Sequence, residues 1–233
     1  MVDPDRVGPM GVARVFGRHG FQVGLIARSK DTLDVLVGEP AELGVTAAEF
    51  PADIRDRDAL VSAITRAGQT LGPVDALEYS PSPTGPITGA GETTVASAVA
   101  QFELHVLGAV TAVGQVLPQM RARGEGALLL TTGVSSTIAA PFLANVGLAM
   151  ASLRNWEHAL HAELRPQGIH AATVTIASSI VPGDEVTDLD VVGSGATPHP
   201  ALARRRGEAR RAEGGDEARV ASHSVQGQEE RHG

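Results

Sequence analysis

Few residues in this sequence are suited to acid–base chemistry at a substrate. Tyr79 is the only tyrosine and Lys30 the only lysine. Tyr79 ends a short apolar run. His105 lies in a long helical segment, where an imidazole can exchange a proton near neutral pH. We interpret these two as a candidate acid pair, with the hydroxyls of Ser135 and Ser136 able to hydrogen-bond a carbonyl. The alternative is that Tyr79 packs at a sheet edge and His105 fills a helix position.

Two glycines near the start of the chain indicate a phosphate-binding turn. Gly8 and Gly11 precede a helical pattern. Glycines let the backbone approach a pyrophosphate, and the N-terminus of the following helix offers free N–H groups and the positive end of its dipole. The alternative interpretation is an ordinary turn before a helix.

No metal site is expected. His158 and His161 are three residues apart, with Glu157 and Glu163 nearby, but such pairs on a polar helix face are usually solvated. The chain has no cysteine, which excludes disulfides, iron–sulfur clusters and thiolate zinc sites.

The elements that position these residues alternate between strands and helices. Asp31 is the expected N-cap of the second helix, and Pro40 is expected to break or kink it. Residues 80–91 are rich in Pro, Gly, Ser and Thr and predict a loop beside any substrate pocket. The predicted strands are 21–27, 45–50, 74–79, 127–132 and 169–176, and the predicted helices are 8–20, 31–43, 56–70, 92–120 and 145–165.

This alternation predicts an α/β fold with a Rossmann-type, doubly wound parallel sheet. Strands that are apolar throughout must be covered by helices on both faces. Residues 1–193 are expected to form this domain. Residues 194–233 lack aromatic residues and carry mixed charge, which predicts a disordered tail.

Composition argues against two classes of protein, those that bind nucleic acids and those that span membranes. The 233 residues are 42% hydrophobic and 20% charged, with a net charge of −8, which argues against nucleic-acid binding. No uninterrupted apolar run reaches the 18 or so residues that span a bilayer, and the N-terminus does not resemble a signal peptide. We therefore expect a cytoplasmic protein without membrane or nucleic-acid partners.

The order of these segments resembles the short-chain dehydrogenase/reductase family, a Rossmann-type group of NAD(P)-dependent oxidoreductases. The resemblance covers about Gly8 to Ile176. It rests on the glycine turn and on the segments 25–29, 52–54, 72–77, 102–108, 118–120, 160–164 and 168–169. In the family an apolar strand precedes the glycine turn, so the resemblance implies that the first strand here is truncated or missing.

The resemblance also implies where a dinucleotide would bind. Arg28 stands where an acid would bind a ribose 2′-hydroxyl, and its guanidinium suits a 2′-phosphate, so NADP is favoured over NAD. The alternative is that residues 28–30 form a solvated loop. The implied cofactor-binding residues are Gly8, Met10, Gly11, Arg28, Ser29, Asp53, Ile54 and Ser80.

The family's catalytic pair is absent. Its Tyr-x-x-x-Lys motif places both side chains on one helix face, and here Val146 and Met150 stand at those positions. The family's serine falls near Gly133, and its helix asparagine corresponds to His105. Two hypotheses follow. One is a divergent NADP-linked oxidoreductase with weak or no ordinary carbonyl reduction, acting on a small carbonyl or alcohol. The other is a non-catalytic relative that acts through homodimers or homotetramers, paired along helices 92–120 and 145–165.

Overall fold

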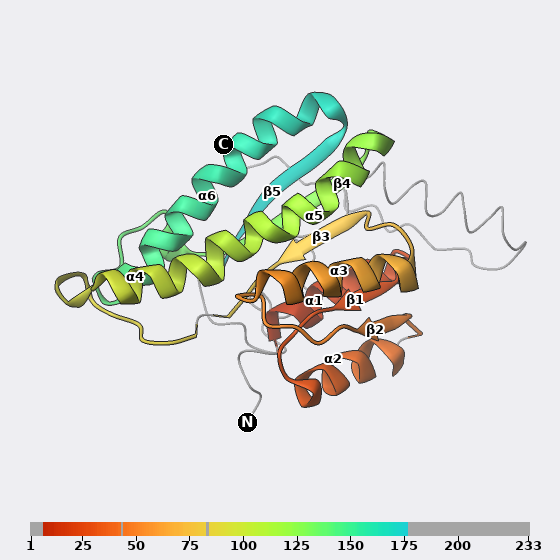
Figure 1. Ribbon diagram of the computed structural model, residues 1–233, viewed down its shortest axis with the longest axis horizontal. Helices are drawn as coiled ribbons and strands as arrows, with labels where there is room; N and C mark the ends of the chain where they lie inside the picture. The colour runs from red at the N-terminus through yellow and green to blue at the C-terminus, as the bar shows by residue number, and fades with distance from the viewer. Residues whose placement is uncertain (1–6, 43, 83, 177–233) are drawn as a thin grey trace, which may run out of the picture.

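The computed structural model describes residues 7–42, 44–82 and 84–176. Within them the predicted alternation of strands and helices is confirmed (Figure 1). The strands are β1 (Val23–Leu25), β2 (Ala47–Glu49), β3 (Ala76–Tyr79), β4 (Gly126–Gly133) and β5 (Ile169–Ile176). The α-helices are α1 (Val7–Arg18), α2 (Lys30–Glu42), α3 (Arg57–Leu71), α4 (Val95–Phe102), α5 (Gly108–Arg123) and α6 (Ala144–Leu164).

All strand pairs are parallel, but the strands form two hydrogen-bonded pieces. β1 pairs with β2, with Val23 opposite Ala47, and β3, β4 and β5 form a second piece in that order. No backbone hydrogen bond joins β1 to β3 within the described residues. The family's first strand would lie between them, and the residues ahead of α1 are outside the described part of the chain.

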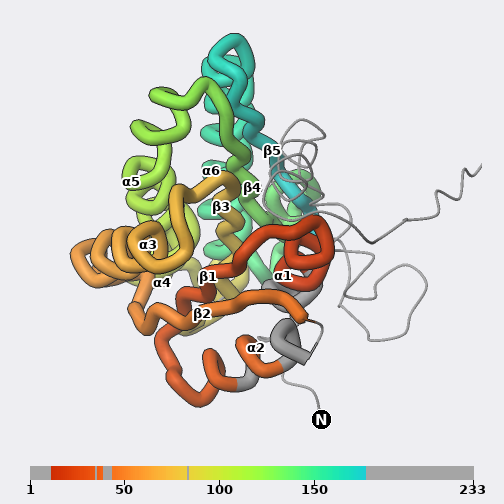
Figure 2. The backbone as a smooth tube through the Cα atoms, turned by 90° about the vertical axis from the view of Figure 1, so that its right-hand side faces the viewer, coloured from red at the N-terminus to blue at the C-terminus, as the bar shows by residue number. Residues whose placement is uncertain are grey.

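Helices cover both faces of the strands. α3 and α5 lie on one side of the strands and α1 on the other (Figure 2). The largest core cluster joins α3, α5 and α6 to Leu128 and Leu130 of β4, both of which are fully buried. On the opposite face, Phe16 of α1 packs with Leu129 of β4. This two-sided cover explains why β4 is apolar throughout.

The predicted long helix over 92–120 consists of three consecutive pieces. α4 passes into a π-helical turn, η3 (Glu103–Leu107), and then into α5. This combined helix, Val95–Arg123, has the length and apolar composition of a membrane span, with 44% of its most apolar window buried inside the fold. Buried core helices of soluble proteins can have the same length and apolar composition.

Three local predictions need correction. Gly8 and Gly11 lie inside α1 rather than in a turn before it. The side chain that caps α2 belongs to Ser29, whose hydroxyl oxygen accepts from the Thr32 N–H at 3.3 Å, because α2 begins one residue before the expected cap, Asp31. Pro40 does not end α2, which continues to Glu42. The predicted tail 194–233 lies outside the described residues.

Candidate active site and cofactor site

The carboxyl ends of the parallel strands gather most of the candidate residues. Arg28 follows β1, Asp53 follows β2, Ser80 follows β3, and Ser135 follows β4. Ligands of open α/β sheets bind at this edge. The common direction of the strands, rather than any single contact, places these side chains along one edge.

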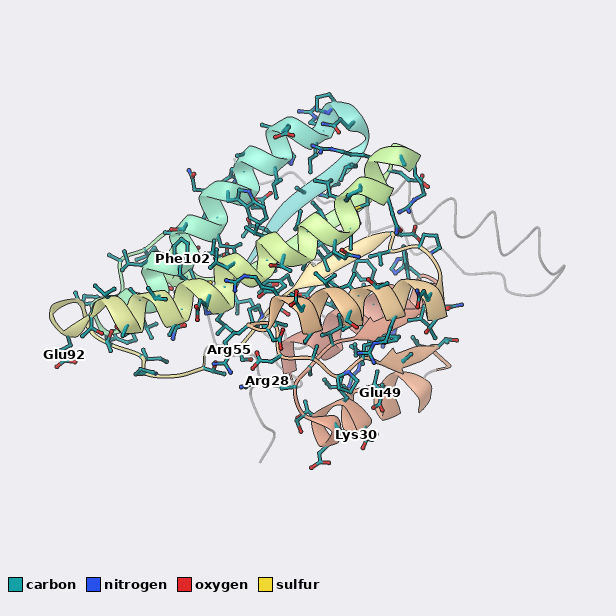
Figure 3. The ribbon with its side chains drawn as sticks, in the orientation of Figure 1. Arg28, Lys30, Glu49, Arg55, Glu92 and Phe102 are labelled. Atoms are coloured by element: carbon teal, nitrogen blue, oxygen red, sulfur yellow. The ribbon has the colours of Figure 1, made fainter. Side chains whose placement is uncertain are left out.

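Arg28 and Asp53 lie near each other at the β1–β2 end of this edge. Asp53 Oδ2 accepts from Arg55 Nη2 at 2.8 Å, and this guanidinium holds the pKa of the carboxyl below its ordinary value, with a smaller effect from the charge of Arg28. Arg28 is exposed, and no hydrogen bond or ion pair within the described residues engages it. Arg28 and Arg55 therefore make this end of the edge cationic (Figure 3).

Lys30 is already paired. Its Nζ donates to Asp34 Oδ1 at 2.8 Å and to Glu49 Oε1 at 2.9 Å, which joins α2 to the end of β2 (Figure 3). These hydrogen bonds raise the pKa of Lys30 above its ordinary value. Lys30 therefore has hydrogen-bonded partners for its charge, whereas Arg28 has none within the described residues.

Ile54 has a side chain packed in the core, whereas the three candidates in α1 offer backbone groups to a cofactor. Ile54 packs against the core around β4, and its carbonyl oxygen lies close to Gly108 of α5. Gly8, Met10 and Gly11 fall within the first five residues of α1. N–H groups in a first helical turn have no partner within the helix, so the backbone of α1 retains the feature that suits a phosphate.

Ser80 is held beside a carboxyl group rather than left open. Its side chain hydrogen-bonds to Glu78, which also accepts from Thr131 Oγ1 at 3.0 Å. Burial raises the pKa of Glu78, and the two hydroxyl donors only partly oppose this rise. Sequence reasoning missed Glu78 as a partly buried acid, although its place inside an apolar strand was a usable signal.

Tyr79 is a buried residue whose hydroxyl is already engaged. Its side chain donates to the Leu104 carbonyl at 2.5 Å. In the π-turn the Gly108 N–H bonds to Glu103 O, so it does not serve Leu104 O as it would in an α-helix. Burial, and to a smaller extent the charge of Asp53, raises the pKa of Tyr79. This geometry favours the packing interpretation over that of a catalytic acid.

His105 lies in the same π-turn and is fully buried. Among the described residues neither ring nitrogen has a hydrogen-bond partner, and Gln101 Oε1, one helical turn earlier, also lacks one there. Burial lowers the pKa of His105 to about 4. The imidazole is therefore neutral at pH 7 and carries no proton that it could readily lose to a substrate.

The two serines after β4 lie beside the start of α6. Ser136 Oγ donates to Thr132 Oγ1 at 3.3 Å, and Thr132 Oγ1 lies 3.1 Å from Thr175 Oγ1 on β5. The backbone of Ser135 contacts α6 at Gly147, where an added Cβ would lie 3.4 Å from the Ser135 carbonyl oxygen. Of the four candidate catalytic residues, only these serines keep half-exposed hydroxyls at the carboxyl edge.

The α6 residues at the positions of the family's pair are part of the core. Val146 is 4% exposed and Met150 is 6% exposed. Neither side chain carries a proton or a charge. Asn145, which sequence reasoning missed, ties α6 to the loop between β3 and α4: its amide donates to Pro86 O at 2.8 Å and accepts from the Thr88 N–H at 2.9 Å. A polar residue at the start of an apolar helix was the only signal for it.

The structure therefore brings together Arg28, Asp53 and Arg55, and separately Tyr79 with the π-turn that holds His105. Within the described residues, no hydrogen bond or ion pair joins these groups to Ser135 or Ser136. Within the described residues no group of three or more His, Asp or Glu side chains could hold a metal ion.

The sequence profile described as short chain dehydrogenase matches residues 10–189, more than half of the chain. The chain belongs to the short-chain dehydrogenase family. It is 25% identical over 173 residues to "Oxidoreductase UcpA" of Salmonella typhimurium (strain LT2), a match that covers 70% of this chain and 62% of that protein. The same match is found in Salmonella typhi. The chain thus spans about three-fifths of the length of these curated relatives.

Solved structures of short-chain dehydrogenases share the fold. The enzyme from Rhodopseudomonas palustris aligns with a TM-score of 0.71 at 21% identity, over 82% of this chain and 85% of that one. A metagenomic short-chain oxidoreductase in complex with NADP aligns with a TM-score of 0.73 at 19% identity, over 86% of each chain. The chain therefore has the Rossmann-type fold of the short-chain dehydrogenase family, whose cofactor is a nicotinamide dinucleotide.

Proposed function

We propose that this short-chain dehydrogenase binds NADP(H) in preference to NAD(H) and reduces ordinary carbonyl compounds slowly or not at all. The observation that carries the cofactor choice is Arg28, an exposed guanidinium at the carboxyl end of β1 that no described residue hydrogen-bonds. A guanidinium binds a phosphate through two parallel hydrogen bonds and offers nothing comparable to a 2′-hydroxyl.

The residues present fit one end of the dinucleotide better than the other. At the adenosine end, Arg28 suits a 2′-phosphate, and Asp53, held in place by Arg55, retains an acceptor oxygen for a base. At the nicotinamide end, the wall of α6 presents the apolar Val146 and Met150. A nicotinamide cofactor supplies hydride chemistry when bound. This chain then contributes binding at Arg28 and, at most, hydroxyl hydrogen bonds from Ser135 and Ser136.

A titration of the full chain with NADPH and with NADH tests the cofactor proposal. We expect NADPH to bind at least about tenfold more tightly, since charge-assisted hydrogen bonds contribute about 1.5–3 kcal/mol. Arg28→Ala should weaken NADPH binding and leave NADH binding unchanged. Arg165→Ala is the matched control, because Arg165 is also exposed but precedes β5 at the opposite edge of the sheet. Equal affinity for both cofactors in the unmodified chain contradicts the proposal.

Turnover is the second test. General acid–base catalysis typically supplies about 10²–10⁴-fold in rate, and an aliphatic hydroxyl is too weak an acid to replace a tuned tyrosine. We therefore expect NADPH oxidation with ketones, aldehydes and quinones to remain near the uncatalysed background. Robust turnover that Tyr79→Phe or His105→Ala abolishes would show that one of these residues replaces the missing acid. Turnover that survives both changes would leave the serines as candidates.

A non-catalytic role through self-association is the alternative, and one observation favours it. α4 and α6, which contact one another, carry exposed apolar side chains: Val95 is 83% exposed and Leu148 56%. Phe142, in the short turn η5 (Pro141–Leu143) ahead of α6, is 71% exposed. An apolar surface of this kind is typical of a protein–protein interface. A homodimer or homotetramer built on these helices, located in the cytoplasm, is consistent with either role.

A further inference from the structure

A cavity of about 350 Å³ lies between α3 and α5. The two helices lie side by side on one face of the strands (Figure 1). Pro73 and Val74, which precede β3, also line the cavity, so it opens at the amino-terminal edge of the sheet. The candidate cofactor residues lie at the opposite, carboxyl edge. The cavity is therefore separate from the site described above.

Three glutamine side chains line this cavity, Gln69 from α3 and Gln115 and Gln119 from α5. Gln115 Nε2 donates to Thr65 Oγ1 at 3.0 Å, which joins the two helices. The amides of Gln69 and Gln119 have no hydrogen-bond partner among the described residues. Each side-chain amide offers two N–H donors and one carbonyl acceptor. The cavity therefore presents both donors and acceptors to an occupant.

The described residues that line the cavity include no charged and no aromatic side chain. Arg123, one helical turn after Gln119, is engaged elsewhere: its Nη2 donates to Val74 O at 2.8 Å and pairs with Asp75 at 3.6 Å. A phosphate or carboxylate would lose hydration in the cavity without gaining an opposite charge. A planar aromatic ligand would find no ring to stack on. The lining therefore favours an uncharged ligand that is not aromatic.

The cavity has an aliphatic floor and is kept open by a glycine. Ile64 and Val116 are buried members of the main core cluster, and Val74 packs against them. A Cβ at Gly68 would meet no atom within 4 Å, and this residue does not have a positive φ. Glycine inside a helix lowers stability relative to alanine. Neither packing nor backbone conformation requires it here, and its missing side chain leaves the cavity accessible.

We propose that this cavity is a second binding site, for an uncharged, hydroxyl-rich ring of the pyranose type. Hydroxyl groups both donate and accept, as the glutamine amides do. The C–H face of a saturated ring can pack on the aliphatic floor. The volume of about 350 Å³ lies within the range of small-molecule pockets. The site needs no nicotinamide cofactor, so it is independent of the function proposed above.

Titration of the full chain with D-glucose, followed by NMR at the side-chain NH₂ groups, tests the site. We expect the signals of Gln69, Gln115 and Gln119 to shift together and to saturate. The expected Kd is on the order of 1 mM, as for a ligand of about 12 non-hydrogen atoms. The NH₂ signal of Gln101, which is buried in α4 outside the cavity, should not shift. D-glucuronate, the same ring with a carboxylate, should bind at least about tenfold more weakly.

Two glycine substitutions provide a matched pair of variants. Gly68→Leu places a side chain in the cavity where its Cβ meets no atom, so it should abolish glucose binding while the protein remains folded. Gly114→Leu is the control, because a Cβ at Gly114 of α5 also meets no atom within 4 Å and this residue does not line the cavity. It should bind glucose as the unmodified chain does.

A further variant, Gln119→Ala, covers the case in which Gly68→Leu does not fold. Loss of one amide should weaken glucose binding by about two- to tenfold, the usual effect of a single hydrogen bond. The proposal is overturned if glucose leaves the three glutamine signals unshifted, or shifts them without saturation. Equal affinity for glucuronate also overturns it, as does glucose binding that Gln119→Ala and a folded Gly68→Leu leave unchanged.

Discussion

His105 is a polar residue in surroundings that offer its ring nitrogens neither water nor a hydrogen-bond partner among the described residues. Both ring nitrogens are buried without a hydrogen-bond partner, and the side chain is fully enclosed by the fold. A charged imidazole would lose most of its hydration there, so burial lowers the pKa to about 4 from the ordinary 6.5. The residue is neutral in the folded protein over a pH range in which it is protonated in the unfolded chain.

This difference makes stability depend on pH with a defined sign. The folded pKa lies below the unfolded value, so the contribution of His105 is complete above pH 6.5 and is lost as the pH falls toward 4. Between pH 7.5 and 5.5 the loss amounts to about 1.4 kcal/mol, from the usual linkage relation. In His105→Leu, the drop in unfolding free energy over this interval should be smaller by roughly that amount. Urea unfolding at both pH values measures it.

His158→Gln is the control, because His158 is an exposed residue of α6. Comparing the two variants separates the effect of burying His105 from that of removing a histidine in general. If His105→Leu loses stability on acidification as steeply as the unmodified chain does, then the pKa of His105 is not lowered by folding. Its charged form would then be stabilised by a partner in the folded state.

The π-turn between α4 and α5 is the element that determines how Tyr79 is used. In η3 the Gly108 N–H bonds to Glu103 O, and Tyr79 donates to Leu104 O from β3. A Cβ at Gly108 would overlap the Tyr79 hydroxyl oxygen and lie 3.2 Å from Ile54 O. Three segments therefore meet closely at one glycine, and the close approach requires the missing side chain.

Two alanine substitutions in one helix should have opposite effects on stability. Gly114→Ala places a Cβ where no atom lies within 4 Å, and should raise the unfolding free energy by about 0.5–1 kcal/mol through helix propensity. Gly108→Ala should lower it by about 1–3 kcal/mol, a typical cost of overpacking. Thermal and urea unfolding of the two variants measures the difference.

The double variant Gly108→Ala with Tyr79→Phe provides the check. Removing the hydroxyl relieves the overlap, so the double variant should be less destabilised than the sum of the two single variants. Strict additivity would show that the glycine and the tyrosine do not constrain one another.

At the scale of the whole molecule, the described residues form an α/β unit with an apolar surface on α4 and α6 that none of them covers. Val95, Val99 and Phe102 follow a helical spacing along α4, and Leu148 lies on α6, which contacts α4. All four are more than a third exposed. A surface of this composition is costly in water, and a second copy of the chain is the simplest partner that would cover it.

We therefore expect the full chain to form a homodimer or homotetramer that the double substitution Val95→Glu with Leu148→Glu dissociates. Light scattering coupled to size exclusion gives the mass directly. Gln69→Glu adds the same residue type to an exposed position on α3 and should leave the mass unchanged. A monomeric mass for the unmodified chain at micromolar concentration would contradict the expectation.

Local patterns in the sequence were sufficient to locate nearly every element. The apolar run 127–132 predicted β4, and the apolar face of residues 56–70 predicted α3. In the structure Asp56 is the N-cap of α3, and its side chain accepts from the Ala59 N–H at 3.0 Å. These signals act over a few residues, as do helix capping and hydrophobic periodicity. The start of α2 was misplaced by one residue because Ser29 and Asp31 are both good N-cap residues.

The absence of a Tyr-x-x-x-Lys pair, and the place of Arg28 after a strand, were also determined by the sequence itself, because composition and order do not depend on folding. What Tyr79, His105 and Ser80 do was decided only by the tertiary structure. Each has a polar group whose role depends on distant partners: Leu104 O for Tyr79, the lack of any partner for His105, and Glu78 for Ser80. The separation of β1 from β3 was likewise decided only by the tertiary structure, because it depends on how α1 and α3 pack onto both pieces of the sheet.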